Sequence, residues 1–248
     1  DPGTGIVVNH SGSTAFSVIG DVGTLFSVDD SLTGSLFSVN TAAGLPIIEA
    51  FSDNTVRIGQ YGQKALYVSQ SAVGIGTETP TPGYKLEVSG SDAIIHNVRV
   101  GRGAGADQYS TAVGSGSLSS NTSGNYNTAI GRGSMTSNTI GYYNTALGSG
   151  AGGSVISGPT VKTTGDYGIY IGYNALALAA SSSNEIVIGS ATSVGGNNTG
   201  LGTNTTSIGN TSTQQSRIYG ALTVVPNTAT GAGNSSTIAA QNGGTNLA

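Results

Sequence analysis

The chain has 248 residues, of which Gly, Ser, Thr and Asn make up about half, while only 8% are charged and the formal net charge is −4. Leu, Ile, Val and Phe contribute about 22% of the residues, near the level at which a compact core becomes hard to build, yet a disordered chain would carry more charge. These values favour a repetitive fold over a globule or a disordered chain. The absence of cysteine excludes disulfides and thiolate chemistry. Without a basic patch or an apolar run of ~18 residues, we expect no nucleic-acid partner and no membrane insertion.

The N-terminal segment 1–72 contains a short repeat with a period of ten or eleven residues. Ala15-Phe16-Ser17-Val18 recurs as Leu25-Phe26-Ser27-Val28 and as Leu36-Phe37-Ser38-Val39, with glycines between the copies. Alternation of large apolar and small polar residues predicts short β-strands joined by turns. Further apolar runs up to Val68 extend this module of short strands.

The segment 73–97 reads as a connection between modules. It runs from Val73-Gly74-Ile75-Gly76 through Pro80 and Pro82 to Tyr84-Lys85-Leu86-Glu87-Val88. Because proline interrupts regular structure, the two prolines predict a hinge.

The segment 98–210 carries the clearest internal repeat. Thr111-Ala112-Val113-Gly114 recurs 17 residues later as Thr128-Ala129-Ile130-Gly131 and again as Thr145-Ala146-Leu147-Gly148. A degenerate copy begins at Val98, and later copies end at Gly172, Gly189 and Gly209. Seventeen residues accommodate about two short strands and two turns at ~3.3 Å per strand residue, so each repeat predicts one flattened coil of a β-solenoid.

Each coil is expected to hold one row of large apolar side chains inside. We predict that Val113, Ile130, Leu147, Ile171 and Ile188 form this inner row, and that Ala112, Ala129 and Ala146 point outward. So thin a core needs cover along its flank and ends, which predicts an oligomer.

Helical periodicity is confined to 174–181, where the alanines and leucines allow at most a turn or two. The C-terminal segment 211–248 is expected to hold a strand followed by a frayed tail from Ala229, because little in it can be buried. The sequence therefore predicts an all-β protein.

Tyrosines recur at one position of the coil. Tyr109, Tyr126 and Tyr143 lie two residues before the Thr of their repeats, and Tyr167 occupies the equivalent place in the next coil. Identical positions on successive coils lie about 4.8 Å apart, so the rings should line one face. With Asn127 and Asn144 beside them, they are the candidate ligand-binding residues, suited to a carbohydrate. The alternative is that the rings fill a seam between protomers, where tyrosine is favoured for its large buried area.

Two motifs resemble known families. The Asn-Thr-Ala-Ile-Gly-Arg-Gly unit at 127–133, repeated at 144–150, is similar to the head repeats of trimeric autotransporter adhesins (YadA-like heads), although these repeat every 14 or so residues. Residues 73–90 resemble a V-G-I-G-T-x-x-P…K-L-x-V-x-G pattern of bacteriophage tail-fibre proteins. The resemblances imply an elongated, fibrous homotrimer of left-handed parallel β-rolls, located on a virion tail outside the cell or, alternatively, on a bacterial surface filament.

Catalytic chemistry has few candidates. A polysaccharide depolymerase needs two carboxylates ~5 to 9.5 Å apart. From Gln108 onward the chain offers only Asp166 and Glu185, which we expect to be a solvated turn acid and a residue at a strand edge. His10 and His96 lie in no nucleophile-elbow context, and His96 is the one candidate for a metal site on a three-fold axis. We therefore expect no catalytic residues, no metal and no cofactor.

The sequence thus favours a structural and adhesive fibre protein whose partners are its own copies, other virion tail or baseplate proteins, and a host-surface glycan or protein. A purely architectural filament or virion decoration subunit is the alternative, and a depolymerase is the third reading. A protruding insertion at 158–167 would favour adhesion over a plain shaft.

Overall fold

The computed structural model describes residues 14–30, 33–63, 65–69, 72–105, 109–152, 164–192, 198–210 and 212–213. Within these residues all regular structure is β-strand, which confirms the predicted all-β class. Contacts divide the chain into two units, 1–210 and 211–248. The strand and tail predicted for 211–248, His10, and most of the insertion at 158–167 lie outside the described residues.

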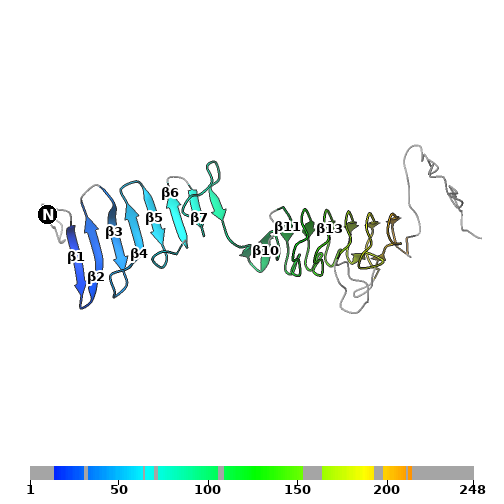
Figure 1. Ribbon diagram of the computed structural model, residues 1–248, viewed down its shortest axis with the longest axis horizontal. Helices are drawn as coiled ribbons and strands as arrows, with labels where there is room; N and C mark the ends of the chain where they lie inside the picture. Colours follow the sequence, from blue (N-terminus) through cyan, green and yellow to red (C-terminus); the bar gives the residue numbers. More distant parts are fainter. Residues whose placement is uncertain are drawn as a thin grey trace, which may run out of the picture. The chain divides into compact units, whose positions relative to one another are not determined.

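The first sheet has eight strands in the order in which they occur along the chain (Figure 1). Each strand from the first to the sixth pairs antiparallel with the next, as the short repeat predicts. The strands are β1 (Thr14–Gly20), β2 (Gly23–Asp29), β3 (Ser35–Asn40), β4 (Pro46–Phe51), β5 (Thr55–Ile58), β6 (Leu66–Ser69), β7 (Ala72–Ile75) and β8 (Leu86–Val88).

The proline-containing loop lies inside this sheet. β8 pairs parallel with β7, so the residues between them form a crossover rather than a hinge between modules. The crossover is held by Thr81, whose backbone N–H donates to Glu87 Oε2 at 2.6 Å, and contacts with Thr81 keep the pKa of Glu87 below its ordinary value. It also packs closely over Gly74, where a Cβ would lie 3.1 Å from Pro80.

The first sheet has one apolar face and one polar face. The polar face carries a cross-strand row, in which each residue pairs with the next: Ser17, Ser27, Ser38, Glu49, Arg57, Tyr67, Gly74 and Glu87. The opposite side, which we call the apolar face, consists of Phe16, Val18, Phe26, Val28, Phe37, Val39, Ile48, Ala50, Val56, Ile58, Leu66, Val68, Val73, Ile75, Leu86 and Val88. Phe26 makes edge-to-face contacts with Phe16 and Phe37 across the strands.

Nothing among the described strands covers the apolar face, because each strand of this sheet contacts chiefly its neighbours within the sheet. Val18, Ile58, Ile75 and Leu86 are accordingly exposed. A single sheet with one bare apolar face leaves much of its hydrophobic stabilisation unrealised until another surface packs on it.

The second sheet forms the predicted β-solenoid. From β11 onward its strands run parallel and in register, with Thr111 beside Thr128 and Thr128 beside Thr145. Its strands are β9 (Ala93–Ile95), β10 (Val98–Gly101), β11 (Thr111–Val113), β12 (Thr128–Ile130), β13 (Thr145–Leu147), β14 (Ile169–Ile171), β16 (Ile186–Ile188) and β18 (Thr206–Ile208). β15 (Ala175–Leu176) and β17 (Asn198–Thr199) pair on another side of the coils.

Two sequence expectations at the solenoid differ from the structure. The copy beginning at Val98 is not a coil, because β10 pairs antiparallel with both β9 and β11. The 174–181 segment forms β15 and turns rather than helix.

The orientation predicted for the coil interior is wrong. Ala112, Ala129 and Ala146 are fully buried, whereas Ile130 and Leu147 are 38% and 47% exposed. Alternation along the strand lets only one of the two sets point inward, and in the first coils this set is the alanines. The large aliphatic residues therefore form a row on the outer surface, which we call the outer aliphatic row: Val113, Ile130, Leu147, Ile171, Ile188 and Ile208.

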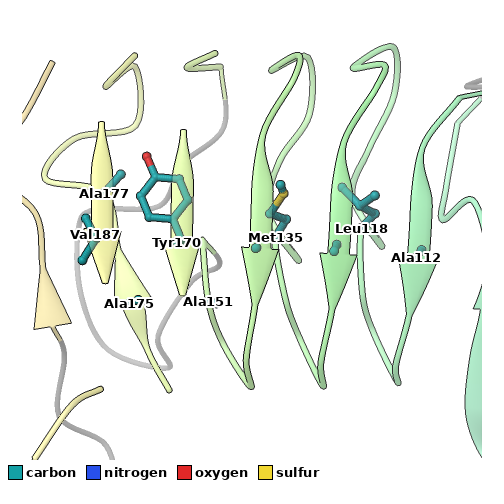
Figure 2. Close-up of a cluster of buried hydrophobic side chains, with 10 residues drawn as sticks. Ala112, Leu118, Met135, Ala151, Tyr170, Ala175, Ala177 and Val187 are labelled. Carbon is teal, nitrogen blue, oxygen red and sulfur yellow. The ribbon is translucent and has the colours of Figure 1, made fainter. Parts of the chain in front are cut away.

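The inner side chains compensate for one another in size (Figure 2). Leu118 and Met135, from the opposite wall, pack with the inner alanines of the first coils. At the fourth coil the strand instead contributes Tyr170, and the opposite wall has Gly152, where a Cβ would lie 3.2 Å from the Tyr170 ring. Close packing of this kind fixes the wall spacing, so changes in volume should be poorly tolerated.

Candidate functional site

The four repeat tyrosines form a continuous stack, as their equivalent positions in successive repeats predict. Ring centroids of Tyr109 and Tyr126 lie 4.8 Å apart, those of Tyr126 and Tyr143 4.9 Å, and those of Tyr143 and Tyr167 5.3 Å, with interplanar angles of 6° or less. The four side chains remain 46% to 62% exposed. We call this feature the tyrosine ladder.

The ladder is built on a backbone conformation that tyrosine disfavours. Tyr126, Tyr143 and Tyr167 have φ angles of 59°, 56° and 56°, in the left-handed region. The next two coils place Asn184 and Asn204 at the same position, with φ angles of 51° and 62°. Asparagine tolerates this region better than a bulky residue does, so tyrosine is kept here at a conformational cost of about 1 to 2 kcal/mol. Such a cost indicates that the rings contribute something the coil itself does not require.

Backbone hydrogen bonds hold the rungs of the ladder rigidly. The N–H of Tyr143 donates to the Asn125 carbonyl at 3.1 Å, and the N–H of Tyr167 donates to the Tyr142 carbonyl at 3.0 Å. Asp166 adds a further link, since its Oδ1 accepts from the Tyr142 N–H at 2.7 Å. Asp166 is therefore a half-buried structural acceptor rather than a freely solvated turn acid.

Asn127 and Asn144 do not belong to the exposed surface. Both are buried and form a ladder inside the coils, in which Asn127 Oδ1 accepts from the backbone N–H of Asn144 at 2.9 Å and from its Nδ2 at 3.1 Å. Their amides also donate to the carbonyls of Gly141 and Gly165. Since both side-chain amides are buried and form hydrogen bonds inside the coils, neither is available to a ligand. The predicted site therefore loses both residues.

Rows of threonine and aliphatic side chains accompany the tyrosines along the strands. Thr128 and Ile130 alternate with the buried Ala129, so both point to the outer surface. The sequence reasoning missed the outer aliphatic row because it placed these residues inside. The small alanine between Thr and the aliphatic residue is the feature that identifies this row, because a buried alanine places both of its neighbours on the outer surface.

The two acids considered for catalysis do not form an accessible pair. Glu185 is fully buried, which corrects its expected place at a strand edge. Its Oε1 accepts from the Gly202 N–H at 2.6 Å, and its Oε2 accepts from the Tyr170 hydroxyl at 3.4 Å. Glu185 occupies the inward position that Asn127 and Asn144 hold in earlier coils, so it satisfies buried donors as they do.

The Tyr170 hydroxyl is held in its protonated form. Burial raises the pKa of Tyr170 far above its ordinary value, and the charge and hydrogen bond of Glu185 raise it further. The hydroxyl is therefore a permanent donor to Glu185 in the folded state.

Tyr170 makes the stability of the solenoid sensitive to high pH. The native state retains this proton more tightly than the unfolded state, in which the pKa of tyrosine is near 10. The stabilisation is therefore complete below pH 10 and falls as the pH rises above it, by up to about 1.4 kcal/mol per pH unit. We expect Tyr170→Phe to flatten this decline and to lower stability at pH 7 by about 1 to 2 kcal/mol through the lost hydrogen bond. Urea unfolding at pH 7, 9.5 and 11 measures both effects, and parallel pH curves for the two proteins would contradict the assignment.

His96 occupies a hairpin turn. It lies with Asn97 between β9 and β10, and both residues have positive φ angles, 49° and 64°, as a two-residue turn of this type requires. Within the described ranges, no three His, Cys, Asp or Glu side chains gather as a metal site would need. The same residues include no helix long and apolar enough to cross a membrane.

Comparisons with protein-family models, with curated proteins and with solved structures find no match to this chain.

Proposed function

We propose that the chain is a structural and adhesive segment of a fibre, which self-associates as a homotrimer and presents the tyrosine ladder to a host-surface glycan. The observation that carries the proposal is the ladder itself, since four exposed rings are kept in register on a backbone that disfavours three of them. The resemblance to YadA-like heads and to tail-fibre proteins adds the fibrous form, the left-handed β-roll and a place on a virion tail.

Self-association is supported by the apolar surface that the described strands leave uncovered. The first sheet has its apolar face, and the solenoid has its outer aliphatic row, where Leu147 and Ile208 are both well exposed. Exposed apolar surface of this extent is typical of a protein interface. Three copies related by a three-fold axis would bury equivalent surfaces together.

Glycan binding is supported by the chemistry of the ladder. The inner rings of Tyr126 and Tyr143 are covered on both faces by their neighbours, so the ladder offers mainly ring edges and phenol hydroxyls. Phenol hydroxyls both donate and accept hydrogen bonds, as sugar hydroxyls do. The ring centroids are 4.8 to 5.3 Å apart along the ladder, so successive rungs present these groups at regular intervals to an extended polysaccharide.

Replacing ladder tyrosines by asparagine, the residue that later coils have at this position, tests the ladder without disrupting the coil. We expect Tyr126→Asn combined with Tyr143→Asn to fold and assemble as the wild type does, because Asn184 and Asn204 already serve this backbone position and bond to each other at 3.0 Å. The same variant should lose binding to host polysaccharide at least about tenfold. Co-sedimentation with capsular and lipopolysaccharide preparations measures binding, and analytical ultracentrifugation measures assembly.

Tyr84→Asn, at an exposed tyrosine away from the ladder, is the control and should bind as the wild type does. If the double variant dissociates, the rings form a seam between protomers and the adhesive role is wrong. If the wild type binds no polysaccharide, the architectural filament remains as the explanation. Shortened polysaccharide would instead indicate a depolymerase.

A further inference from the structure

A pocket of about 240 Å³ opens beside the middle of the first sheet, away from the tyrosine ladder. It is lined by β4, β5 and β6, by the turn between β5 and β6, and by Glu78 from the crossover after β7.

Three of the lining residues belong to the cross-strand row on the polar face. Glu49 pairs with Arg57, and Arg57 pairs with Tyr67, so a carboxylate, a guanidinium and a phenol lie side by side. The Arg57 guanidinium carbon lies 4.6 Å from the Phe51 ring centroid and 5.7 Å from that of Tyr67. These contacts orient the guanidinium, which leaves less side-chain entropy to be lost when a ligand binds.

Other lining residues add groups of complementary chemistry. Tyr61, 63% exposed in the β5–β6 turn, provides an aromatic surface, and Gln60 beside it carries an amide that both donates and accepts. Glu78 adds a second carboxylate to the lining.

We infer that this pocket binds a short neutral saccharide. An aromatic surface suits the apolar face of a pyranose ring, two carboxylates accept hydrogen bonds from sugar hydroxyls, and Arg57 and Gln60 donate to sugar oxygens. Glu49 and Glu78 disfavour a phosphate or another anion, because each carboxylate would repel it. The combination of aromatic, acidic and amide groups around one concave surface carries the inference.

The site is independent of the tyrosine ladder and compatible with self-association. Glu49, Arg57 and Tyr67 lie on the polar face, opposite the apolar face that we propose as a subunit interface, whereas Ile58 and Leu66 of the lining belong to the apolar face. The polar groups of the pocket would therefore stay open to solvent when the apolar face is packed against another copy.

Saturation-transfer NMR on the full-length chain tests the inference with four probes: the methyl glycosides of glucose, galactose and N-acetylglucosamine, and the anionic methyl glucuronide. We expect transfer to at least one neutral glycoside and weaker transfer to the glucuronide. Tyr61→Ala should reduce affinity for that glycoside about tenfold through loss of ring contact. Tyr84→Ala is the matched control, because Tyr84 is also an exposed turn tyrosine of this sheet and lies outside the pocket.

Several outcomes would overturn the inference. These are the absence of transfer to all three neutral glycosides, equal binding by wild type and Tyr61→Ala, or preferred binding of the glucuronide. The ladder variant Tyr126→Asn with Tyr143→Asn separates the two proposals, because it should leave this binding unchanged while it weakens binding of host polysaccharide at least about tenfold.

Discussion

Replacing Gly148 by alanine is expected to abolish cooperative folding of the solenoid. Gly148 has a φ of +134°, and a Cβ there would lie 2.6 Å from the carbonyl oxygen of Gly172 in the next coil. The neighbouring backbone cannot withdraw, because Gly148 donates to Ile130 at 2.9 Å and Gly172 donates to Leu147 at 2.8 Å. The clash would break this stacking of coils at a cost of about 4 kcal/mol or more. Since coils of a solenoid stabilise their neighbours, the loss should spread along it.

Gly133→Ala separates the clash from the backbone preference. Gly133 also has a positive φ, +66°, but a Cβ there would meet open space. Only the cost of a left-handed alanine remains, about 1 to 2 kcal/mol. Thermal melting followed by far-UV circular dichroism compares the two variants, and equal melting temperatures would show that contact between coils does not set the glycine requirement.

Placing carboxylates on the apolar face is expected to dissociate the proposed trimer. Val18 is 45% exposed and Ile58 40%, so Val18→Asp combined with Ile58→Asp should leave the individual sheet folded. In an assembly that buries this face, each unpaired carboxylate would cost several kcal/mol. Sedimentation velocity should therefore give a trimer for the wild type and a monomer for the variant.

Ser17→Asp is the control for this experiment. Ser17 is exposed and adjacent to Val18 in β1, but its side chain lies on the polar face. A carboxylate there should leave the trimer intact. A wild-type chain that sediments as a monomer, or equal dissociation by both variants, would contradict packing through the apolar face.

Secondary structure was largely predictable because local patterns dominate in both sheets. Alternating phenylalanine, serine and valine predicts β1 to β3, and the 17-residue recurrence of Thr-Ala-aliphatic-Gly predicts β11 to β13 in parallel register. The stacking of the tyrosine ladder follows from the same recurrence. Equal spacing in sequence becomes equal position in successive coils, whatever fills the interior.

The direction of each side chain was not predictable from pattern alone. Thr-Ala-Ile alternates equally well with either set inside, and hydrophobicity favours burying isoleucine. The choice depends on which side chains the opposite wall contributes, and in the first coils these are Leu118 and Met135. The alanines pack with them inside, and the larger strand residues lie outside.

The burial of polar side chains inside the coils was not predictable for a related reason. Asn127, Asn144 and Glu185 are of residue types that usually lie at the surface. Their burial is tolerable because the turns of neighbouring coils bring carbonyl and N–H groups such as those of Gly141 and Gly202 within hydrogen-bond reach. Such partners are distant in sequence and are assembled only by coiling.

The sequence by itself determined the all-β class, the coil length and the register of the tyrosine ladder, because each depends on periodicity along one chain. The tertiary structure decided which faces are inside, which polar groups form hydrogen bonds within the fold, and where a pocket forms beside Arg57 and Tyr61. These properties depend on distances between segments far apart in the chain. Packing and hydrogen-bond geometry set those distances, and local residue pattern does not.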